Sequence, residues 1–404
     1  MSYSYEEIID FVEQEDVIFI HLAFTDAFGR QKKIAIPPDE LRRAFTDGIS
    51  FDASAIAGFT GVIKSDLFLF PIPDTLTILP WRSFQGKVVR MFCDIRYPDG
   101  TPYEKDSRAI LKSAVKAARN MNLSVSFGSE FEFYLFNLDE KGRPTKDPID
   151  QAGYMDVAPF DRGENIRREI VLTMKEIGIY PETSHHEEGP GQNEVDFRYS
   201  NAITAADNAM NFQTVVHAIA MQNGVYADFS PKPLPDNAGN GLHINMSVNI
   251  IDGVDDTDYT PYFMAGIIKH IKELSAFLNP VEESYKRLGE KKAPKYISWS
   301  HQNRSQLIRI PAAKGQYKRI ELRSADPMTN PYIAYALLIY AGLDGIKNRY
   351  ELPDPVDIDL YNADAAELMN IDQLPGSLEE ARKIAVDSTF INSVLPENFL
   401  DILK

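Results

Sequence analysis

The segment GSEFEFYLF, residues 128–136, places two glutamates inside what otherwise reads as a buried β-strand. Side chains alternate between the two faces of a strand, so Glu130 and Glu132 must point to the same side. Two like charges on one face of an apolar strand repel each other and resist leaving water. The fold must therefore bring compensating groups to that face, and this requirement constrains the chain more than any other segment.

Two further segments carry side chains of the same chemical kind. In HHEEGPGQNEVDFRY, residues 185–199, Glu187 and Glu194 flank a Gly-Pro-Gly turn that can bring two strand ends together. His243 lies in GNGLHINMS, an expected strand that begins after two glycines. We therefore expect carboxylates and an imidazole from different strands to meet.

Two more expected strands carry arginines. NRSQLIRIP contains Arg304 and Arg309, and KRIELRSADP contains Arg319, Glu321 and Arg323. The last three residues are two apart from one another, so a strand would show arginine, glutamate and arginine on one face.

Together these residues predict a metal-dependent site for phosphoryl transfer. Five carboxylates and a histidine in one cavity need hard divalent cations, and Mg²⁺ or Mn²⁺ suits such oxygen ligands. Nearby arginines would bind phosphate oxygens in pairs. The sequence has no GxxxxGK[ST] loop, and GNGLHI lacks the third glycine of a dinucleotide fingerprint. Metals and arginines would therefore hold the nucleotide, with Glu130 and Glu132 as metal ligands.

Each motif taken singly also has a purely structural interpretation. A Glu-x-Glu pair is more often a solvated strand edge, and a single histidine such as His243 is more often a hydrogen-bonded core residue. The histidines at 185–186 can simply pack or cap, and the Arg-Glu-Arg segment can be a surface ladder of ion pairs. Five such coincidences on strands that share one placement are much less common than one.

The 404 residues suffice for two domains. Residues 1–103 read as short strands and turns, which suits a small sheet domain. In residues 104–404, strands alternate with longer helices, the first of which Asp106 would cap. Four more helices are expected at residues 163–178, 203–222, 261–277 and 331–347.

Composition narrows the possible partners. The net charge of −17 argues against general binding of nucleic acid, which needs a basic surface. Cys93 is the one cysteine, so neither an internal disulfide nor a cysteine metal cluster is possible. The N-terminus lacks the order of a signal peptide, and the apolar stretch 332–343 is too short to span a bilayer. We expect a cytoplasmic protein without membrane partners.

The ordered motifs resemble those of the glutamine synthetase family over nearly the whole chain. In sequence order they are FDASAIAGF (51–59), GSEFEFYLF, DQAGYMDVAPFDRGENIRREI, HHEEGPGQNEVDFRY, NGLHINMS, SYKRL, NRSQLIRIP, RIELRSADPMTNPYIAYALLIYAG and LPGSLEEA. The resemblance implies an α+β fold: a β-grasp-like N-terminal domain and a larger catalytic domain whose curved antiparallel sheet is flanked by helices. It also implies a homo-oligomer of rings, typically a dodecamer, with active sites between subunits.

The implied reaction is ATP-dependent amide formation at the γ-carboxylate of glutamate, through γ-glutamyl phosphate, with ammonia or an organic amine as acceptor. Two or more Mg²⁺ or Mn²⁺ ions would bind in each site. The implied ligands of one metal are Glu132, Glu187 and Glu194. The implied ligands of the other are Glu130, His243 and Glu321. The implied catalytic residues are Asp52, Arg304 and Arg309. The implied substrate-binding residues are Tyr154, Gly239, Arg287 and Arg323. The implied nucleotide-binding residues are Glu182, Tyr199, Ser247 and Arg319.

Some positions depart from the family pattern near the acceptor and glutamate. The loop GEKKAP, residues 289–294, places Lys292 where a glutamate is usual, although Glu290 is nearby. Ala55 replaces a serine and Ala238 an asparagine. Lysine in place of glutamate removes negative charge where a cationic acceptor would bind. This change fits either a weaker need to capture ammonium or an anionic group on the acceptor or donor. The alternative is that Lys292 is simply a solvated loop lysine.

Three functions remain open from the sequence. The first is a glutamine synthetase, the second a γ-glutamyl-amine ligase of the same family, and the third a weakly catalytic nitrogen-sensing homologue. Intact metal and phosphate residues argue against the third. Tyr350 lies near a position where some bacterial members carry a modifiable tyrosine, but YELP alone does not show such regulation.

Overall fold

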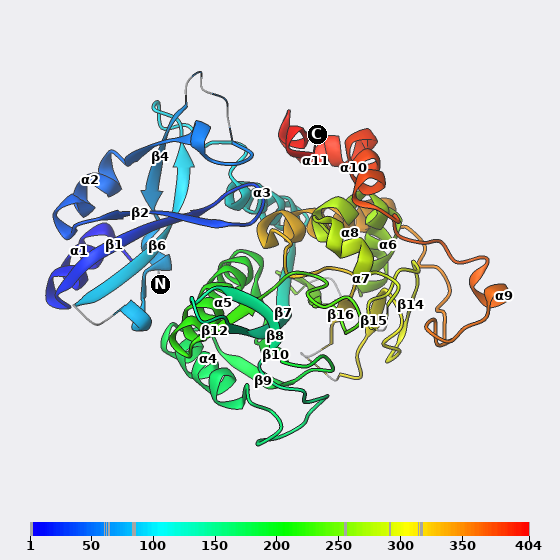
Figure 1. Cartoon of the computed structure of the whole chain (residues 1–404). Helices are drawn as coiled ribbons and strands as arrows, with labels where there is room; N and C mark the ends of the chain where they lie inside the picture. Colours follow the sequence, from blue (N-terminus) through cyan, green and yellow to red (C-terminus); the bar gives the residue numbers. More distant parts are fainter. Residues whose placement is uncertain are drawn as a thin grey trace. The chain divides into compact units, whose positions relative to one another are not determined.

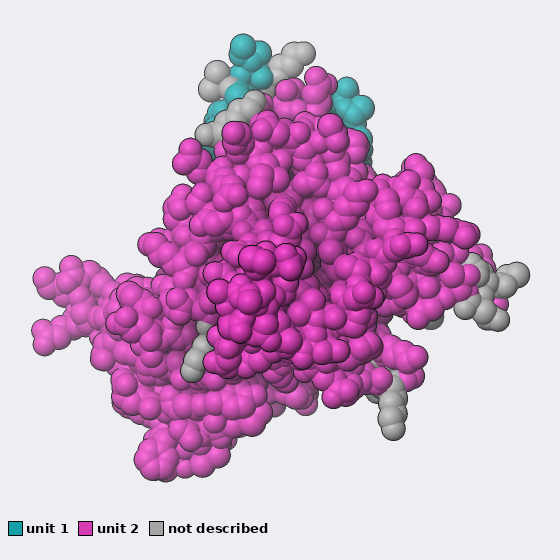
Figure 2. Space-filling model, turned by 90° about the vertical axis from the view of Figure 1, so that its right-hand side faces the viewer, with its two compact units in different colours: residues 1–110, 176–178 teal, residues 111–175, 179–404 magenta. Residues whose placement is uncertain are grey.

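The computed structural model describes residues 3–59, 61, 63, 65–82, 86–253, 257–290, 292–313, 315 and 318–403. The chain divides into two compact units, coloured separately in Figure 2: unit 1 comprises residues 1–110 and 176–178, and unit 2 comprises residues 111–175 and 179–404. The boundary after residue 103 drawn from the sequence stays a prediction.

Unit 1 is built on a six-stranded sheet with the order β2-β1-β6-β4-β3, and β5 pairs with β6 (Figure 1). Its strands are β1 Val17–Thr25, β2 Gln31–Ile36, β3 Ile49–Asp52, β4 Asp66–Pro71, β5 Thr77–Ile78 and β6 Lys87–Arg96. The expectation of short strands in residues 1–103 is therefore confirmed. Buried aliphatic side chains such as Leu22, Leu69 and Val89 form its core.

Two α-helices in unit 1 correct the expectation of strands and turns alone. They are α1 Tyr5–Gln14 and α2 Leu41–Thr46. The first helix begins with a capping box in which Ser4 and Glu7 exchange side-chain hydrogen bonds. Its buried residues Ile8 and Val12 lie one turn apart. This acidic segment is therefore a short amphipathic helix, whose inner face also includes the partly buried Ile9 and Phe11.

Unit 2 contains a ten-stranded sheet with the order β14-β15-β16-β13-β7-β10-β9, and β8, β11 and β12 also pair with β7. Its strands are β7 Leu123–Leu138, β8 Pro144–Pro148, β9 Pro181–His186, β10 Gln192–Phe197, β11 Ser200–Asn201, β12 Val225–Asp228, β13 Leu242–Ile250, β14 Trp299–His301, β15 Ile308–Ile310 and β16 Ile320–Leu322. The last two are shorter than the sequence suggested. The 16-residue strand β7 is the central strand of this sheet, because five other strands hydrogen-bond to it.

All five helices expected in residues 104–404 are present, and the described residues of that range contain four more that were not expected. Across the chain the longer ones are α3 Ser107–Asn120, α4 Glu164–Glu176, α5 Ala202–Gln222, α6 Thr260–Leu278, α8 Pro331–Asn348 and α10 Leu378–Asp387. The shorter ones are α7 Glu282–Arg287, α9 Ala365–Leu368 and α11 Thr389–Val394. Asp106 caps α3 as expected, since its Oδ1 accepts a hydrogen bond from the backbone N–H of Arg108 at 3.1 Å. Within the described residues, every helix is too short or too polar to cross a bilayer.

Helices α6 and α8 pack directly against each other through glycines. A Cβ atom built on Gly266 would lie 2.1 Å from the carbonyl oxygen of Ala341, and one built on Gly345 would lie 2.1 Å from that of Tyr262. Both distances are far inside van der Waals contact, so the backbones touch where side chains would otherwise keep them apart. Glycine is required here for close approach, although it lowers helix propensity.

We expect Gly345→Ala to destabilise unit 2 by about 2 kcal/mol. Forcing the helices apart costs about 3 kcal/mol, the upper end for overpacking, and alanine recovers about 1 kcal/mol of helix propensity. Calorimetry of the thermal transition measures this as a fall in Tm of several degrees. Gly253→Ala is the matched control, because a Cβ at Gly253 meets no described atom within 4 Å. Equal Tm values for the two variants would contradict the packing argument.

Candidate active site

The register of β7 with its neighbours positions the two glutamates of the opening motif. Glu130 lies opposite His243 of β13, and Glu132 lies opposite Glu194 of β10. The Gly-Pro-Gly turn joins β9 to β10 as an antiparallel hairpin, so Glu187 comes close to Glu194 as expected. Hydrogen-bonding of the strands alone therefore gathers carboxylates from distant parts of the sequence.

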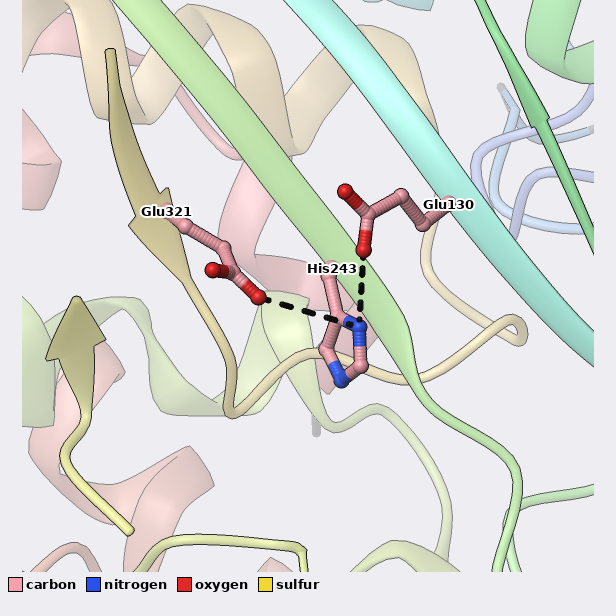
Figure 3. Close-up of side chains that lie close together, drawn as sticks. All are labelled: Glu130, His243 and Glu321. Atoms are coloured by element: carbon pink, nitrogen blue, oxygen red, sulfur yellow. Dashed lines mark hydrogen bonds and ion pairs between the residues drawn. The ribbon is translucent and has the colours of Figure 1, made fainter. Parts of the chain in front are cut away.

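The first predicted metal-ligand set lies together. Figure 3 shows Glu130 of β7, His243 of β13 and Glu321 of β16 with their side chains pointing toward one another. His243 Nδ1 lies 3.2 Å from Glu130 Oε2 and 3.9 Å from Glu321 Oε1. One ligand atom from each residue lies within 4.8 Å of the others, close enough to share an ion.

Hydrogen bonds fix the charge of Glu130. Burial raises its pKa, but the contact with His243 and the hydrogen bond that Asn245 Nδ2 donates at 2.8 Å outweigh burial, and the pKa falls to about 2. The carboxylate is therefore ionised throughout the physiological range. It offers a permanent negative charge to a cation.

The second predicted set, Glu132, Glu187 and Glu194, is divided between two overlapping clusters. Glu132 and Glu194 group with His243, and Glu187 and Glu194 group with His185, whose Nε2 lies 3.1 Å from Glu187 Oε1. Glu194 belongs to both. The structure thus places all six predicted ligands in one chain of linked clusters.

Negative charge accumulates around Glu194. Burial raises its pKa well above the usual value, and the carboxylates of Asp196 and Glu132 add to that rise. Burial likewise raises the pKa of Asp196 to about 7, and the charge of Glu130 adds to it. These two carboxyl groups hold their protons because no positive charge lies close enough to stabilise the carboxylates. A divalent cation would supply that charge, so it would displace the protons and bind. The donor set fits Mg²⁺ or Mn²⁺.

Sequence reasoning missed Asp196. It lies opposite Glu130 in the β10–β7 register and forms a further cluster with Glu130 and Glu194. Its Oδ1 is buried without a hydrogen-bond partner in the described chain, while Oδ2 bonds to Thr183. The signal was present, because Asp196 follows Glu194 by two residues and must share its face, as Glu132 does with Glu130.

The titration of Asp196 leads to a test by pH. Its pKa of about 7 in the folded protein exceeds its ordinary value of 3.8, so folding favours the protonated form. Its contribution to stability is complete below pH 4 and is lost as pH rises through 7. We expect the Tm of the metal-free protein to fall more steeply from pH 5 to 8 than that of Asp196→Asn. Asp252→Asn, at an exposed position, should keep the wild-type slope, and a wild-type slope in Asp196→Asn would refute the assignment.

The arginines of the last two motifs converge on Glu321. Arg309 Nη1 donates to one of its oxygens at 2.6 Å and Arg323 Nη1 to the other at 2.5 Å. Glu321 and Arg323 are each 1% exposed. Arg304 supplies its carbonyl oxygen to Arg323 Nε and leaves its own side chain exposed. Buried charges of both signs therefore lie side by side at the first ligand set.

All four predicted nucleotide-binding residues line one cavity of about 170 Å³. They come from four segments of unit 2 and are Glu182, Tyr199, Ser247 and Arg319. Glu130 and Asp196 line the same cavity, so it opens onto the carboxylate clusters. Arg319 Nε donates to Asn245 Oδ1 at 2.8 Å. Lys318 also lines the cavity and was not singled out from the sequence.

Two of the predicted substrate-binding residues, Gly239 and Arg287, lie against each other. A Cβ on Gly239 would lie 2.4 Å from the carbonyl oxygen of Pro231 and 2.9 Å from Arg287 Cγ. Arg287 is 2% exposed, and its Nη1 donates to the carbonyl of Ser324 at 2.9 Å. Its Nε is buried with no hydrogen-bond partner among the described residues. A buried, incompletely paired guanidinium is a ready donor to an added carboxylate.

Asp52 belongs to unit 1. It ends β3, is exposed, and accepts hydrogen bonds from the N–H of Ser54 at 2.9 Å and the hydroxyl of Ser54 at 2.6 Å. These bonds lower its pKa. Tyr154 lies in unit 2, with its ring edge-on to His185.

Comparison with known protein families agrees with this arrangement. The model of the glutamine synthetase catalytic domain matches residues 104–403, and that of the glutamine synthetase β-grasp domain matches residues 16–98. These matches cover well over half of the chain, which belongs to the glutamine synthetase family. The expected α+β fold, with a β-grasp domain and a catalytic domain, is confirmed.

Individual relatives and structures are similar along almost the full length. A glutamine synthetase of Methanosarcina mazei is 44% identical over 407 residues, covering 97% of this chain and 91% of that protein. One of Clostridium saccharobutylicum is 45% identical over 393 residues, covering 94% and 88%. A solved GmaS/ADP complex is 28% identical with a TM-score of 0.88, covering 98% and 93%. A Plasmodium falciparum glutamine synthetase shares the fold at 24% identity and a TM-score of 0.86, covering 100% and 95%.

Proposed function

We propose that this protein is a glutamine synthetase, which uses ATP to join ammonia to the γ-carboxylate of glutamate. The observation that carries the proposal is the continuity of three features within unit 2. The cavity lined by the four nucleotide-binding candidates opens onto linked carboxylate–histidine clusters, and buried arginines lie against those clusters. Glutamine synthetases that cover most of the chain at 44–45% identity support the same activity.

Two metal positions follow from the clusters. Glu130, His243 and Glu321 would hold one divalent cation, and Glu132, Glu187 and Glu194 would hold the other. Such cations, when bound, neutralise carboxylate and phosphate charge and polarise the transferring phosphoryl group. Arg309 and Arg323, which each donate to one oxygen of Glu321, would hold that carboxylate in position.

The remaining residues bind and orient the substrates. Glu182, Tyr199, Ser247 and Arg319 would contact the nucleotide from the walls of the cavity. Arg287 and Arg323 would bind the carboxylates of glutamate, with the backbone at Gly239 close to its amino group. Arg304, whose side chain is exposed, can reach a phosphoryl group from the solvent side, and Arg309 can do so from the strand.

The chemistry needs activation because a carboxylate is a poor electrophile. A γ-carboxylate oxygen of glutamate attacks the terminal phosphorus of ATP, ADP leaves, and γ-glutamyl phosphate forms. The nitrogen of ammonia then attacks the carbonyl carbon, and inorganic phosphate leaves. Ammonium must first lose a proton, which a carboxylate of this pocket would accept. Asp52 of a neighbouring copy would complete this pocket in a ring-shaped oligomer.

A γ-glutamyl-amine ligase is the second candidate, and one contact favours it. Lys292 turns its ammonium group toward Glu187 and Tyr154, where an acceptor would bind. Ala238 adds to this case, since it offers no side-chain amide beside Gly239. The solved GmaS complex shares 28% identity with this chain. A nucleotide-binding sensor without turnover is the weakest candidate, because every predicted metal ligand is present.

One experiment separates these functions. Phosphate release from Mg-ATP and glutamate is measured with ammonium and then with a panel of primary amines, and products are identified by mass spectrometry. Efficient formation of glutamine is expected. Turnover with an organic amine alone would move the assignment to the amine ligase, and no turnover with any acceptor would refute both enzymes.

A further inference from the structure

Lys292 carries its ammonium group into a cage of negative and aromatic groups. Its Nζ lies 3.2 Å from Glu188 Oε1 and 3.4 Å from Glu187 Oε2. It also lies 4.4 Å from the ring centroid of Tyr154, in the geometry of a cation–π contact. We call Glu187, Glu188 and Tyr154 the cage. Two carboxylates and an aromatic face around one primary ammonium are the groups that would recognise an alkylammonium cation, and here the ammonium belongs to the chain itself.

The cage is built independently of the lysine. Glu187 directly follows β9, and its side chain is 7% exposed. His185 links its members, since its Nε2 lies 3.1 Å from Glu187 Oε1 and its ring meets that of Tyr154 edge-on at 5.3 Å. The negative, aromatic site would therefore persist if the lysine left.

The backbone of loop 289–294 directs Lys292 into this cage. The N–H of Gly289 donates to the carbonyl of Ala293 at 2.8 Å, and the N–H of Ala293 donates to that of Glu290 at 3.1 Å. These bonds close a tight turn in which Lys292 adopts a φ of 63°, a region that residues with side chains rarely occupy.

The acidic residue of the loop points elsewhere. The side chain of Glu290 is 61% exposed, and its nearest described cation is Lys232 at 4.0 Å. The Glu290 carboxylate therefore does not share the cage with Glu187. Among the described residues of the loop, the charge that enters the cage is the positive charge of Lys292.

We propose that Lys292 is a specificity-determining residue that acts as a tethered competitor of the amine acceptor. This inference rests on the proposed function, because the cage is the pocket in which a cationic acceptor would lose its proton. The head group of lysine is itself a primary alkylammonium, so ammonium or an organic amine must displace Lys292 before binding. The partly exposed side chain, at 34%, has room to swing out toward solvent.

The expected effect follows from the time that the cage spends open. When a site is competent for a fraction f of the time, the apparent dissociation constant rises by 1/f. A tethered group holds its site at a high effective concentration. If Lys292 fills the cage for roughly 70–90% of the time, its removal lowers the KM for the acceptor about three- to ten-fold.

The test compares three variants of the full-length protein. Lys292→Met removes the charge at similar length, and the KM for ammonium and for methylammonium should fall by that factor while the KM for glutamate stays. Lys292→Arg keeps a cation in the cage and should keep a high acceptor KM. Lys295→Met is the matched control, because it removes a charge near the same loop from a lysine that lies over the Tyr296 ring.

The dependence on salt distinguishes occupation of the cage by Lys292 from a long-range effect of the lysine charge. Attraction between exposed charges is screened over about 10 Å at 0.1 M salt, whereas direct occupancy of the cage is not. The difference between Lys292→Met and wild type should therefore persist at 0.5 M salt. A difference that vanishes with salt, or an unchanged acceptor KM in Lys292→Met, would overturn the proposal.

A binding measurement keeps this inference distinct from the proposed function. Titration of methylammonium followed by NMR needs no turnover and should show tighter binding to Lys292→Met than to wild type. Absence of phosphate release with tighter binding would refute the ligase while supporting the tethered competitor. Phosphate release, with the same methylammonium affinity and the same acceptor KM in Lys292→Met and wild type, would support the ligase and refute the tethered competitor.

Discussion

Glu132→Ala should reduce turnover at least 100-fold, the largest functional effect we expect from a single substitution. Glu132 belongs to the cluster that links the two proposed metal positions. It also accepts hydrogen bonds from Gly241 N–H at 2.7 Å and from Gln192 Nε2 at 3.2 Å, so its position is fixed. Loss of a residue that merely supports a ligand commonly costs 10–100-fold, and loss of the ligand itself should cost at least the upper value.

The same substitution is checked by a readout that needs no catalysis. Calorimetric titration with Mn²⁺ should lose one class of sites in Glu132→Ala, and Glu132→Gln, which keeps the shape, should lose it too. Glu140→Gln is the matched control, because Glu140 follows β7 in the chain but is exposed. Normal Mn²⁺ binding together with normal turnover in Glu132→Ala would show that the metal assignment is wrong.

Arg323→Met should destabilise unit 2 by about 3 kcal/mol. Arg323 and Glu321 are both buried, and removal of one member of such a pair leaves an uncompensated charge, which costs 3–5 kcal/mol. The lower end applies because Arg309 still contacts Glu321. Arg323→Lys should recover part of the loss, because it keeps the positive charge beside Glu321. The recovery should be incomplete, because an ammonium cannot donate to both Glu321 and the Arg304 carbonyl with the geometry of a guanidinium.

A second arginine–carboxylate pair in the same unit provides the comparison. Arg143 pairs with Asp139 at 2.7 Å, but the arginine side chain is 69% exposed. Exposed pairs contribute about 0–1 kcal/mol, so Arg143→Met should leave the urea midpoint nearly unchanged. Similar midpoints for Arg143→Met and Arg323→Met would contradict the distinction between buried and exposed pairs.

The part of the site that strands dictate was predictable from sequence. Alternation along β7 put Glu130 and Glu132 on one face, and the turn after β9 brought Glu187 near Glu194. Such patterns depend on the pleat, whose period of two residues is independent of the rest of the fold. Helices α3 and α4 were predictable for the corresponding reason, since their apolar positions repeat with the helical period. Helix α8 is apolar nearly all round and was predictable from the length of its apolar run, which exceeds that of an ordinary strand.

Features that depend on tertiary contacts were not predictable. The contact of Lys292 with Tyr154 joins residues far apart in the chain, and its direction is set by a turn with a positive φ. Nothing in the letters GEKKAP distinguishes that turn from one that faces solvent. Helix α1, by contrast, was predictable and was missed, because Ile8, Ile9, Phe11 and Val12 follow the helical spacing behind the Ser4–Glu7 capping box.

The position of β7 has a consequence for how such a chain can change length during evolution. The strand pairs on both edges and alternates Glu130 and Glu132 on one face with the buried rings of Phe131 and Phe133 on the other. Inserting or deleting a single residue there would exchange the two faces, burying the carboxylates in the apolar layer and turning the rings into the acceptor and metal pocket. Insertions and deletions should therefore be tolerated only in segments where no strand pairing depends on the number of residues. Loop 289–294, which lies between α7 and β14, is such a segment.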